Sequence, residues 1–163
     1  MKKNTAFAIA FAVSVLTLAF VLAASVANAQ TYRSHVQPLI KAQCAEFHGA
    51  DAPTLAEFKL DEEKYTKEKL GPRTDTYENL LQIMVYPDSG AFMRRVDDGT
   101  STSNKKPGNM YKHLGATDTE RQTNLKMLKS WVGEGAWNLN RWGAKGEIPA
   151  ITKEQMDKVQ VKY

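Results

Sequence analysis

The chain has 163 residues, of which 42% are hydrophobic and 25% are charged, and its formal net charge at pH 7 is +4. This length allows a targeting segment followed by one domain with a single core. The small charge excess is not gathered into a basic stripe, so the composition gives no support to nucleic-acid binding. It allows only weak electrostatic steering toward an acidic partner.

Residues 1–29 are typical of a secretory signal peptide. A basic start is followed by an apolar run over residues 6–26, and Ala27-Asn28-Ala29 offers the small residues that a signal peptidase reads. We expect cleavage after Ala29 and export to the periplasm, which leaves residues 30–163 as the functional domain. The alternative is an uncleaved membrane anchor, because the apolar run approaches the ~20 residues that a spanning helix needs.

The segment 30–49 is predicted to form one helix that begins near its proline and stops at Gly49. Its apolar residues follow helical spacing at Val36, Leu39, Ile40 and Cys44. Cys44 and His48 are four residues apart, so we expect them on the same face of this helix. One flat ligand would then contact both side chains.

The middle of the chain is predicted to be less regular. Residues 50–59 are expected to form a loop, and the charged segment 61–70 a short helix stopped by a Gly-Pro pair. Residues 75–78 have the spacing of a capping box and predict a helix that runs through residue 84. A turn is expected at 87–90, and the polar segment 97–108 is predicted to be a surface loop.

The clearest predicted helix begins after Thr117, because Thr117 and Glu120 have the spacing of a capping box. Its apolar residues share one stripe at Leu125, Leu128, Trp131 and Val132. We expect Gly133 or Gly135 to end this helix, and a short last helix to begin after Thr152. With no alternating strand pattern of useful length, the fold is predicted to be all-α with long loops, around a cofactor that supplies much of the core.

The segment Cys44-Ala45-Glu46-Phe47-His48 differs from the C-x-x-C-H motif of covalent haem attachment at Phe47 alone. A c-type haem needs a thiol at the porphyrin edge and an imidazole on the iron, roles that Cys44 and His48 fit. Cys44 is the only cysteine, and a thioether would account for an unpaired thiol in an exported protein. We therefore expect haem c attached through Cys44 only, with the Phe47 ring against the porphyrin edge.

The second axial ligand is sought among the sulfur and imidazole side chains that follow His48. These are Met84, Met93, Met110 and His113. Met84 lies on an apolar stripe and is expected in the core, and Met93 in the core or the pocket wall. Met110 is favoured, because a methionine in a polar Pro-Gly loop has no evident core role. His113, Met93 or an open position are the alternatives.

Further residues are candidates for the surroundings of a haem. Arg94 and Arg95, with Lys105 and Lys106, are placed to meet haem propionates or an acidic redox partner, and a solvated loop surface is their alternative. Tyr111 and Trp131 are expected in the pocket wall or in the core.

Taken together, these features resemble the small monohaem cytochromes c. The matching stretches are the signal peptide, the helix leading into CAEFHG, the loop PGNMYKHLG, and ERQTNLKMLKSWVGEGAW, which looks like the W-[IV]-x-x-G-A ending of periplasmic cytochrome c domains. The resemblance implies a cytochrome c fold wrapped around one haem and one-electron transfer rather than enzyme catalysis. It implies axial ligation by His48 and Met110, exchange with redox partner proteins of unknown identity, and a missing second thioether cysteine at Phe47.

Other functions stay open at this point. One is a haem-free relative that serves as an interaction or structural subunit, with Cys44 free or bridging to a partner. Another is a peroxidase-like or sensor role with an open distal site. A zinc site of Cys44, His48 and either His35 or His113 lacks the repeated close-pair spacing of structural zinc sites.

Overall fold

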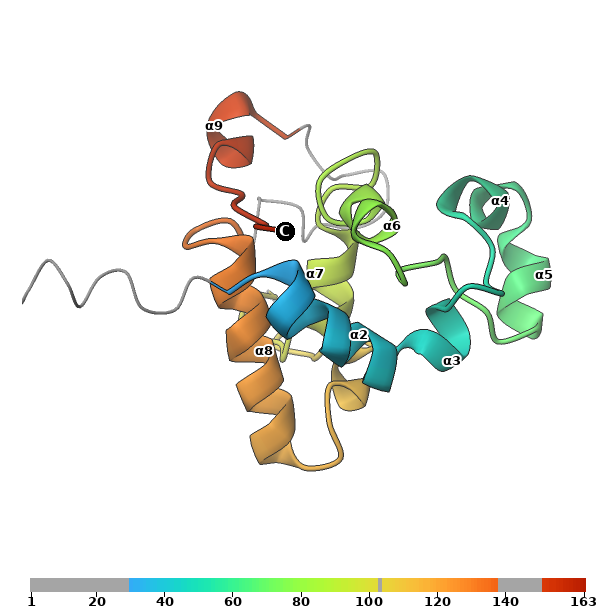
Figure 1. Cartoon of the computed structure of the whole chain (residues 1–163), viewed down its shortest axis with the longest axis horizontal. Helices are drawn as coiled ribbons and strands as arrows, with labels where there is room; N and C mark the ends of the chain where they lie inside the picture. The colour runs from blue at the N-terminus through green and yellow to red at the C-terminus, as the bar shows by residue number, and fades with distance from the viewer. Residues whose placement is uncertain (1–29, 103, 138–150) are drawn as a thin grey trace, which may run out of the picture.

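The computed structural model describes residues 30–102, 104–137 and 151–163 (Figure 1). The expected signal segment 1–29 lies outside these residues. The described secondary structure is helical and contains no strand, which confirms the all-α prediction. Within the same ranges, no helix combines the length and apolar character needed to cross a membrane.

The helices are mostly short, so capping side chains and tertiary packing stabilise them more than their own length does. In chain order the described elements are the π-helix η1 (Tyr32–Val36), α2 (Gln37–Gln43), α3 (Ala45–His48), α4 (Leu55–Leu60), α5 (Glu62–Lys67), α6 (Tyr77–Gln82), α7 (Ala91–Val96), the 3-10 helix η2 (Tyr111–His113), α8 (Asp118–Val132) and α9 (Lys153–Met156).

The prediction of one continuous helix over residues 30–49 is wrong. A π-turn, η1, leads directly into α2, and Cys44 then interrupts the helix with a backbone φ of −123°. The interruption is mild, because the backbone N–H of His48 still donates to the carbonyl oxygen of Cys44 at 2.9 Å. Cys44 and His48 therefore remain one helical turn apart.

Two helices, α4 and α7, were not predicted. The start of α4 is a capping box in which Glu57 accepts from the backbone of Thr54 at 2.8 Å and Thr54 Oγ1 accepts from the backbone of Glu57 at 3.2 Å. This T-x-x-E pattern is present in the sequence and could have revealed the helix. The start of α7 depends on Gly90, whose φ of 78° favours glycine.

The start of α6 also differs from the prediction. Thr76, and not Asp75, is the N-cap, and its hydroxyl accepts from the backbone N–H of Asn79 at 3.2 Å. The Asp75 carboxylate instead accepts two hydrogen bonds from the Arg73 guanidinium at 2.8 and 3.1 Å. The helix ends at Gln82, so Met84 lies beyond it, although its side chain is buried.

The prediction for α8 is confirmed. Thr117 and Glu120 form the capping box, the predicted stripe is buried, and the helix ends at Gly133. The last helix, α9, begins after Thr152 as expected. The prediction that residues 97–108 form a surface loop is correct for most of them but wrong for Asp97, which is fully buried.

The core lies where η1, α2, α6, α7 and α8 meet. η1 packs on α8, and η2 packs on both α7 and α8. The C-terminal segment closes over α8, where the indole N–H of Trp131 donates to the carbonyl oxygen of Lys162 at 2.7 Å. Figure 1 shows α4 and α5 side by side, on the far side of the molecule from α8. The segment that joins α5 to α6 returns along α3, and this return builds the site described next.

Candidate functional site

Cys44 lies at the break between α2 and α3. Its side chain is half-buried and packs against the hydrophobic core. It is a free cysteine, and burial raises the pKa of its thiol to about 11. The thiol is therefore protonated at neutral pH, at the edge of the core and one helical turn before His48.

The segment 71–74 runs along α3 and is fixed to it by backbone hydrogen bonds. The N–H of Gly71 donates to the carbonyl oxygen of Phe47 at 3.0 Å, and the N–H of Thr74 donates to that of His48 at 2.9 Å. Between them, the carbonyl oxygen of Pro72 lies 2.8 Å from Nδ1 of His48. This carbonyl can only accept, so Nδ1 carries a proton and Nε2 is the ring nitrogen left to bind a ligand.

Gly71 also lies against the imidazole ring. A Cβ atom at this position would lie 2.1 Å from Cε1 of His48, which no side chain could tolerate without displacing the ring. The sequence predicted the Gly71-Pro72 pair only as a helix stop, and neither contact with His48 was predicted. Their partner is in a different helix, and no local pattern marks that contact.

Burial is the main cause that lowers the pKa of His48. The hydrogen bond to Pro72 opposes this shift, whereas the positive charges of Arg95 and His113 add to it. Two conclusions follow. His48 is neutral at physiological pH, the form that binds a metal ion. In addition, the C-terminal end of α7 and the helix η2 lie close enough to the ring to act on it electrostatically.

The backbone of Met110 is hydrogen-bonded to both Arg95 and His113. Its backbone N–H donates to the carbonyl oxygen of Arg95 at 2.8 Å, and its own carbonyl accepts from the N–H of His113 at 3.0 Å. Its side chain is half-buried and contacts the hydrophobic core. Met110 is thus joined by backbone hydrogen bonds to Arg95 and His113, the two residues that act electrostatically on His48.

The other methionine candidates are in the core. The side chain of Met84 is 1% exposed and that of Met93 is 0% exposed. A core position was predicted for Met84 and was one of the two positions predicted for Met93. His113 is exposed at the end of η2.

Of the arginines, Arg95 is the one whose charge acts on His48. Arg94 instead pairs with Asp88 at 3.7 Å and donates to the carbonyl oxygen of Ser89 at 3.2 Å. Arg94 makes these contacts with the segment just before α7, and its expected contact with a haem propionate stays a prediction. Lys105 and Lys106 are exposed in the loop before Met110.

The two aromatic candidates differ in their surroundings. Tyr111 is half-buried beside Met110, and its hydroxyl accepts from the side-chain amide of Gln122 at 2.9 Å. Trp131 is 1% exposed, and its ring centroid lies 6.3 Å from that of Tyr32. Trp131 therefore has the core role that was one of its two expected roles.

The donor set of a thiol, an oriented imidazole and a thioether matches what haem c requires. Across the described ranges, no three His, Cys, Asp or Glu side chains gather as they would around a metal ion, so the zinc alternative gains no support. Phe47 is half-buried and has no thiol, so Cys44 is the one residue of this motif that could form a thioether. The residues present fit a haem held by a single thioether.

Two comparisons with known proteins found matches among cytochromes c. The family model described as PccH cytochrome c matches residues 31–163. Among solved structures, the chain is similar to the monohaem cytochrome PccH from Geobacter sulfurreducens, with 46% sequence identity and a TM-score of 0.72 over 83% of this chain and 100% of that one. No curated protein sequence gives a significant match.

Proposed function

Because the chain belongs to the PccH cytochrome c family, we propose that residues 30–163 form an exported monohaem cytochrome that carries single electrons. Membership of this family implies haem c as the cofactor. The observation that best supports the proposal is the orientation of His48, whose Nδ1 is held by the Pro72 carbonyl at 2.8 Å. A metal-binding histidine generally donates its other ring N–H in this way, which fixes the tautomer and the ring orientation.

Cys44 would form the only thioether to the haem. One such bond is enough to tether the cofactor, and neither axial ligand depends on a second one. Phe47 stands where the motif has its second cysteine. If its ring crowds the porphyrin edge, overpacking of this kind typically costs ~1–3 kcal/mol. We therefore expect weaker loading than in a chain with both cysteines.

Bound haem supplies a one-electron iron couple. In this proposal His48 holds the iron through Nε2, and the Met110 sulfur, a soft and neutral donor, favours the reduced state and raises the potential. Arg95 offers a positive charge near the ring of His48, and a guanidinium there suits a haem propionate. In this proposal, redox partner proteins would exchange single electrons with the haem that these residues hold.

A redox titration of the purified haem-loaded chain tests this function. The account predicts reversible oxidation with a slope of about 59 mV per decade, the value for one electron. A colourless protein whose Cys44 reacts fully with a thiol reagent would support the haem-free interaction subunit instead. Export is tested separately by the N-terminal sequence of the mature protein, which should begin at Gln30.

A further inference from the structure

Asp97 is a fully buried carboxylate at the end of α7. Its Oδ2 accepts from the backbone N–H groups of Gly99 at 2.8 Å and Ser101 at 3.2 Å. Its Oδ1 accepts from the hydroxyl of Ser101 at 3.0 Å and from the indole N–H of Trp137 at 2.8 Å. Both oxygens are therefore fully used, and the carboxylate connects the start of the loop 97–110 to the segment that follows α8.

The charge of Asp97 is compensated from α8. The Lys129 ammonium lies 3.6 Å from Oδ1 of Asp97 and 4.0 Å from Oδ1 of Asp98. The same ammonium lies 5.5 Å from the ring centroid of Trp137. A buried carboxylate is tolerated only when it is paired and hydrogen-bonded, and this one is both.

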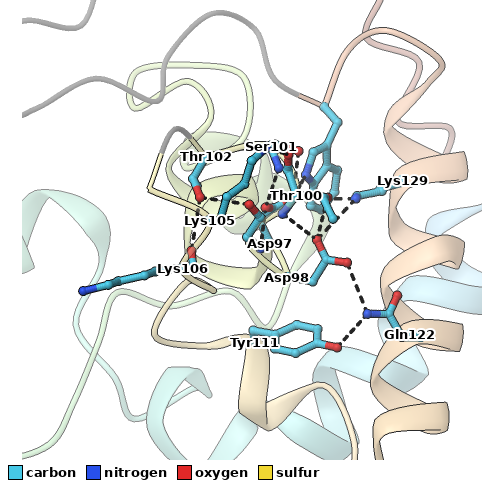
Figure 2. A network of polar contacts seen from close by, with 12 residues as sticks. Asp97, Asp98, Thr100, Ser101, Thr102, Lys105, Lys106, Tyr111, Gln122 and Lys129 are labelled. Atoms are coloured by element: carbon cyan, nitrogen blue, oxygen red, sulfur yellow. Dashed lines mark hydrogen bonds and ion pairs between the residues drawn. The ribbon is translucent and has the colours of Figure 1, made fainter.

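The network continues to the residue next to Met110 (Figure 2). The side-chain amide of Gln122 donates to Oδ2 of Asp98 at 3.2 Å and to the hydroxyl of Tyr111 at 2.9 Å. An amide nitrogen has two protons, so both bonds can exist together. Figure 2 shows Gln122 projecting from α8 between Asp98 and Tyr111.

The backbone of the loop also closes on α7. The N–H of Gly108 donates to the carbonyl oxygen of Asp97 at 2.9 Å, and the N–H of Met110 donates to that of Arg95 at 2.8 Å. A Cβ at Gly108 would lie 2.3 Å from the carbonyl oxygens of Arg94 and Arg95. Met110 is therefore held at three neighbouring points. These are its own backbone N–H, the bond from Gly108 two residues earlier to the carbonyl oxygen of Asp97, and the contact of Tyr111 with Gln122.

We propose that Asp97 is the positioning residue for the distal ligand, because its buried network holds the Met110 loop closed. The proposal rests on the proposed function, in which Met110 is that ligand. A ligand from solution can reach the iron only when the loop opens, so its apparent affinity is reduced by the fraction of open molecules. Weakening the Asp97 network should raise that fraction.

Imidazole binding to the ferric haem-loaded chain tests this in a double-mutant cycle. Asp97→Asn turns one acceptor oxygen into a donor that faces two backbone donors or the Trp137 indole. We expect it to raise imidazole affinity by roughly tenfold, the change for about 1.4 kcal/mol. In a Met110→Ala background the distal position is already open, so the same substitution should change the affinity less than about twofold.

A matched control separates loop anchoring from general destabilisation. The hydroxyl of Tyr77 donates to the carbonyl oxygen of Val161, in the C-terminal segment, at 2.7 Å. Tyr77→Phe removes this hydrogen bond, which lies outside the Asp97 network. It should leave imidazole affinity unchanged in both backgrounds. If Asp97→Asn fails to fold, Ser101→Ala removes only one donor to Asp97 and should show a smaller effect of the same sign.

The outcomes separate this proposal from the proposed function. An equal effect of Asp97→Asn in both backgrounds, or no effect in either, would overturn the positioning role while leaving Met110 as the ligand. Equal imidazole affinity of the parent and Met110→Ala would instead show that Met110 is not the ligand. The positioning role of Asp97 would then be disproved as well.

Hydrogen exchange of the haem-free chain gives an independent readout. Asp97→Asn should speed exchange of the Gly108 and Met110 amides by roughly tenfold, and Tyr77→Phe should not. Unchanged exchange at both amides would overturn the anchoring of the loop whether or not the chain holds haem.

Discussion

Nδ1 of His48 lies 2.8 Å from the carbonyl oxygen of Pro72, which fixes both the tautomer and the direction of the ring. The two residues are 24 positions apart in the chain, and the segment 71–74 brings them together through its backbone bonds to α3. The imidazole is thus oriented by the backbone of the chain itself.

Gly71→Ala is predicted to disturb this orientation. Its Cβ would lie 2.1 Å from Cε1 of His48, so the ring must move and the hydrogen bond to Pro72 must weaken or break. Loss of such a partner typically weakens metal binding by 10–100-fold. We expect a clear fall in haem absorbance per purified chain.

Gly135→Ala is the control for this substitution. Its φ of 73° also makes alanine unfavourable, but the nearest atom to the added Cβ is Lys158 Cδ at 3.6 Å. It should destabilise the chain without lowering haem content. Equal haem content in the two variants would contradict the role of Gly71.

Phe47→Cys is predicted to increase haem content relative to the parent. The substitution restores the C-x-x-C-H motif that haem-attachment machinery recognises, and it allows a second thioether. Both proteins should be purified from cells with active attachment machinery and compared by haem absorbance per chain. Phe47→Ala removes the ring without adding a thiol, and so separates crowding from covalent attachment. Equal haem absorbance per chain in the parent and in Phe47→Cys would contradict the prediction.

Met110→Ala is predicted to open the distal position of the iron. Carbon monoxide should then bind rapidly to the reduced protein, whereas in the parent it must first displace the methionine sulfur. His113→Ala is the matched test, because His113 is the alternative ligand and is exposed on η2. It should leave carbon monoxide binding as slow as in the parent. Rapid binding in His113→Ala alone would assign the distal position to His113.

The Cys44 thiol of haem-free chains is predicted to react slowly. Burial raises its pKa to about 11, so at pH 8 its thiolate fraction is roughly a hundredfold below that of a free cysteine. The greater nucleophilicity of a more basic thiolate offsets part of this difference. We expect alkylation about tenfold slower in the folded chain than in urea, with a rate that keeps rising beyond pH 9. A rate that levels off near pH 8.5 would contradict the raised pKa.

The sequence predicted well those features whose signals are local. The long helix α8 has a capping box at Thr117, a buried stripe and a terminal glycine, and all of them lie within its own segment. Cys44 and His48 were identified by a short motif, and their spacing survives the break between α2 and α3. The helices α4 and α7 were missed for different reasons: the capping box of Thr54 and Glu57 that begins α4 was overlooked, and α7 begins at Gly90 without a side-chain cap.

The parts of the site that were not predicted depend on contacts between distant segments. Pro72 acts through its backbone carbonyl, which any residue has, so its identity does not signal the bond to His48. Asp97 looks like one more charged residue in a polar loop, yet the fold buries it and directs the Trp137 indole onto its carboxylate at 2.8 Å. Arg94 and Arg95 are adjacent in the sequence, yet Arg94 pairs with Asp88 at 3.7 Å, whereas Arg95 acts electrostatically on His48.

The intact mass of the denatured protein tests the central claim most directly. A thioether survives unfolding, whereas haem held only by His48 and Met110 is released. The account predicts a chain that begins at Gln30 and carries the added mass of one haem, together with a fraction that carries none. Cys44→Ser should abolish the heavier species. A parent protein found only at the mass of the bare chain, from cells that attach haem to Phe47→Cys, would contradict covalent attachment through Cys44.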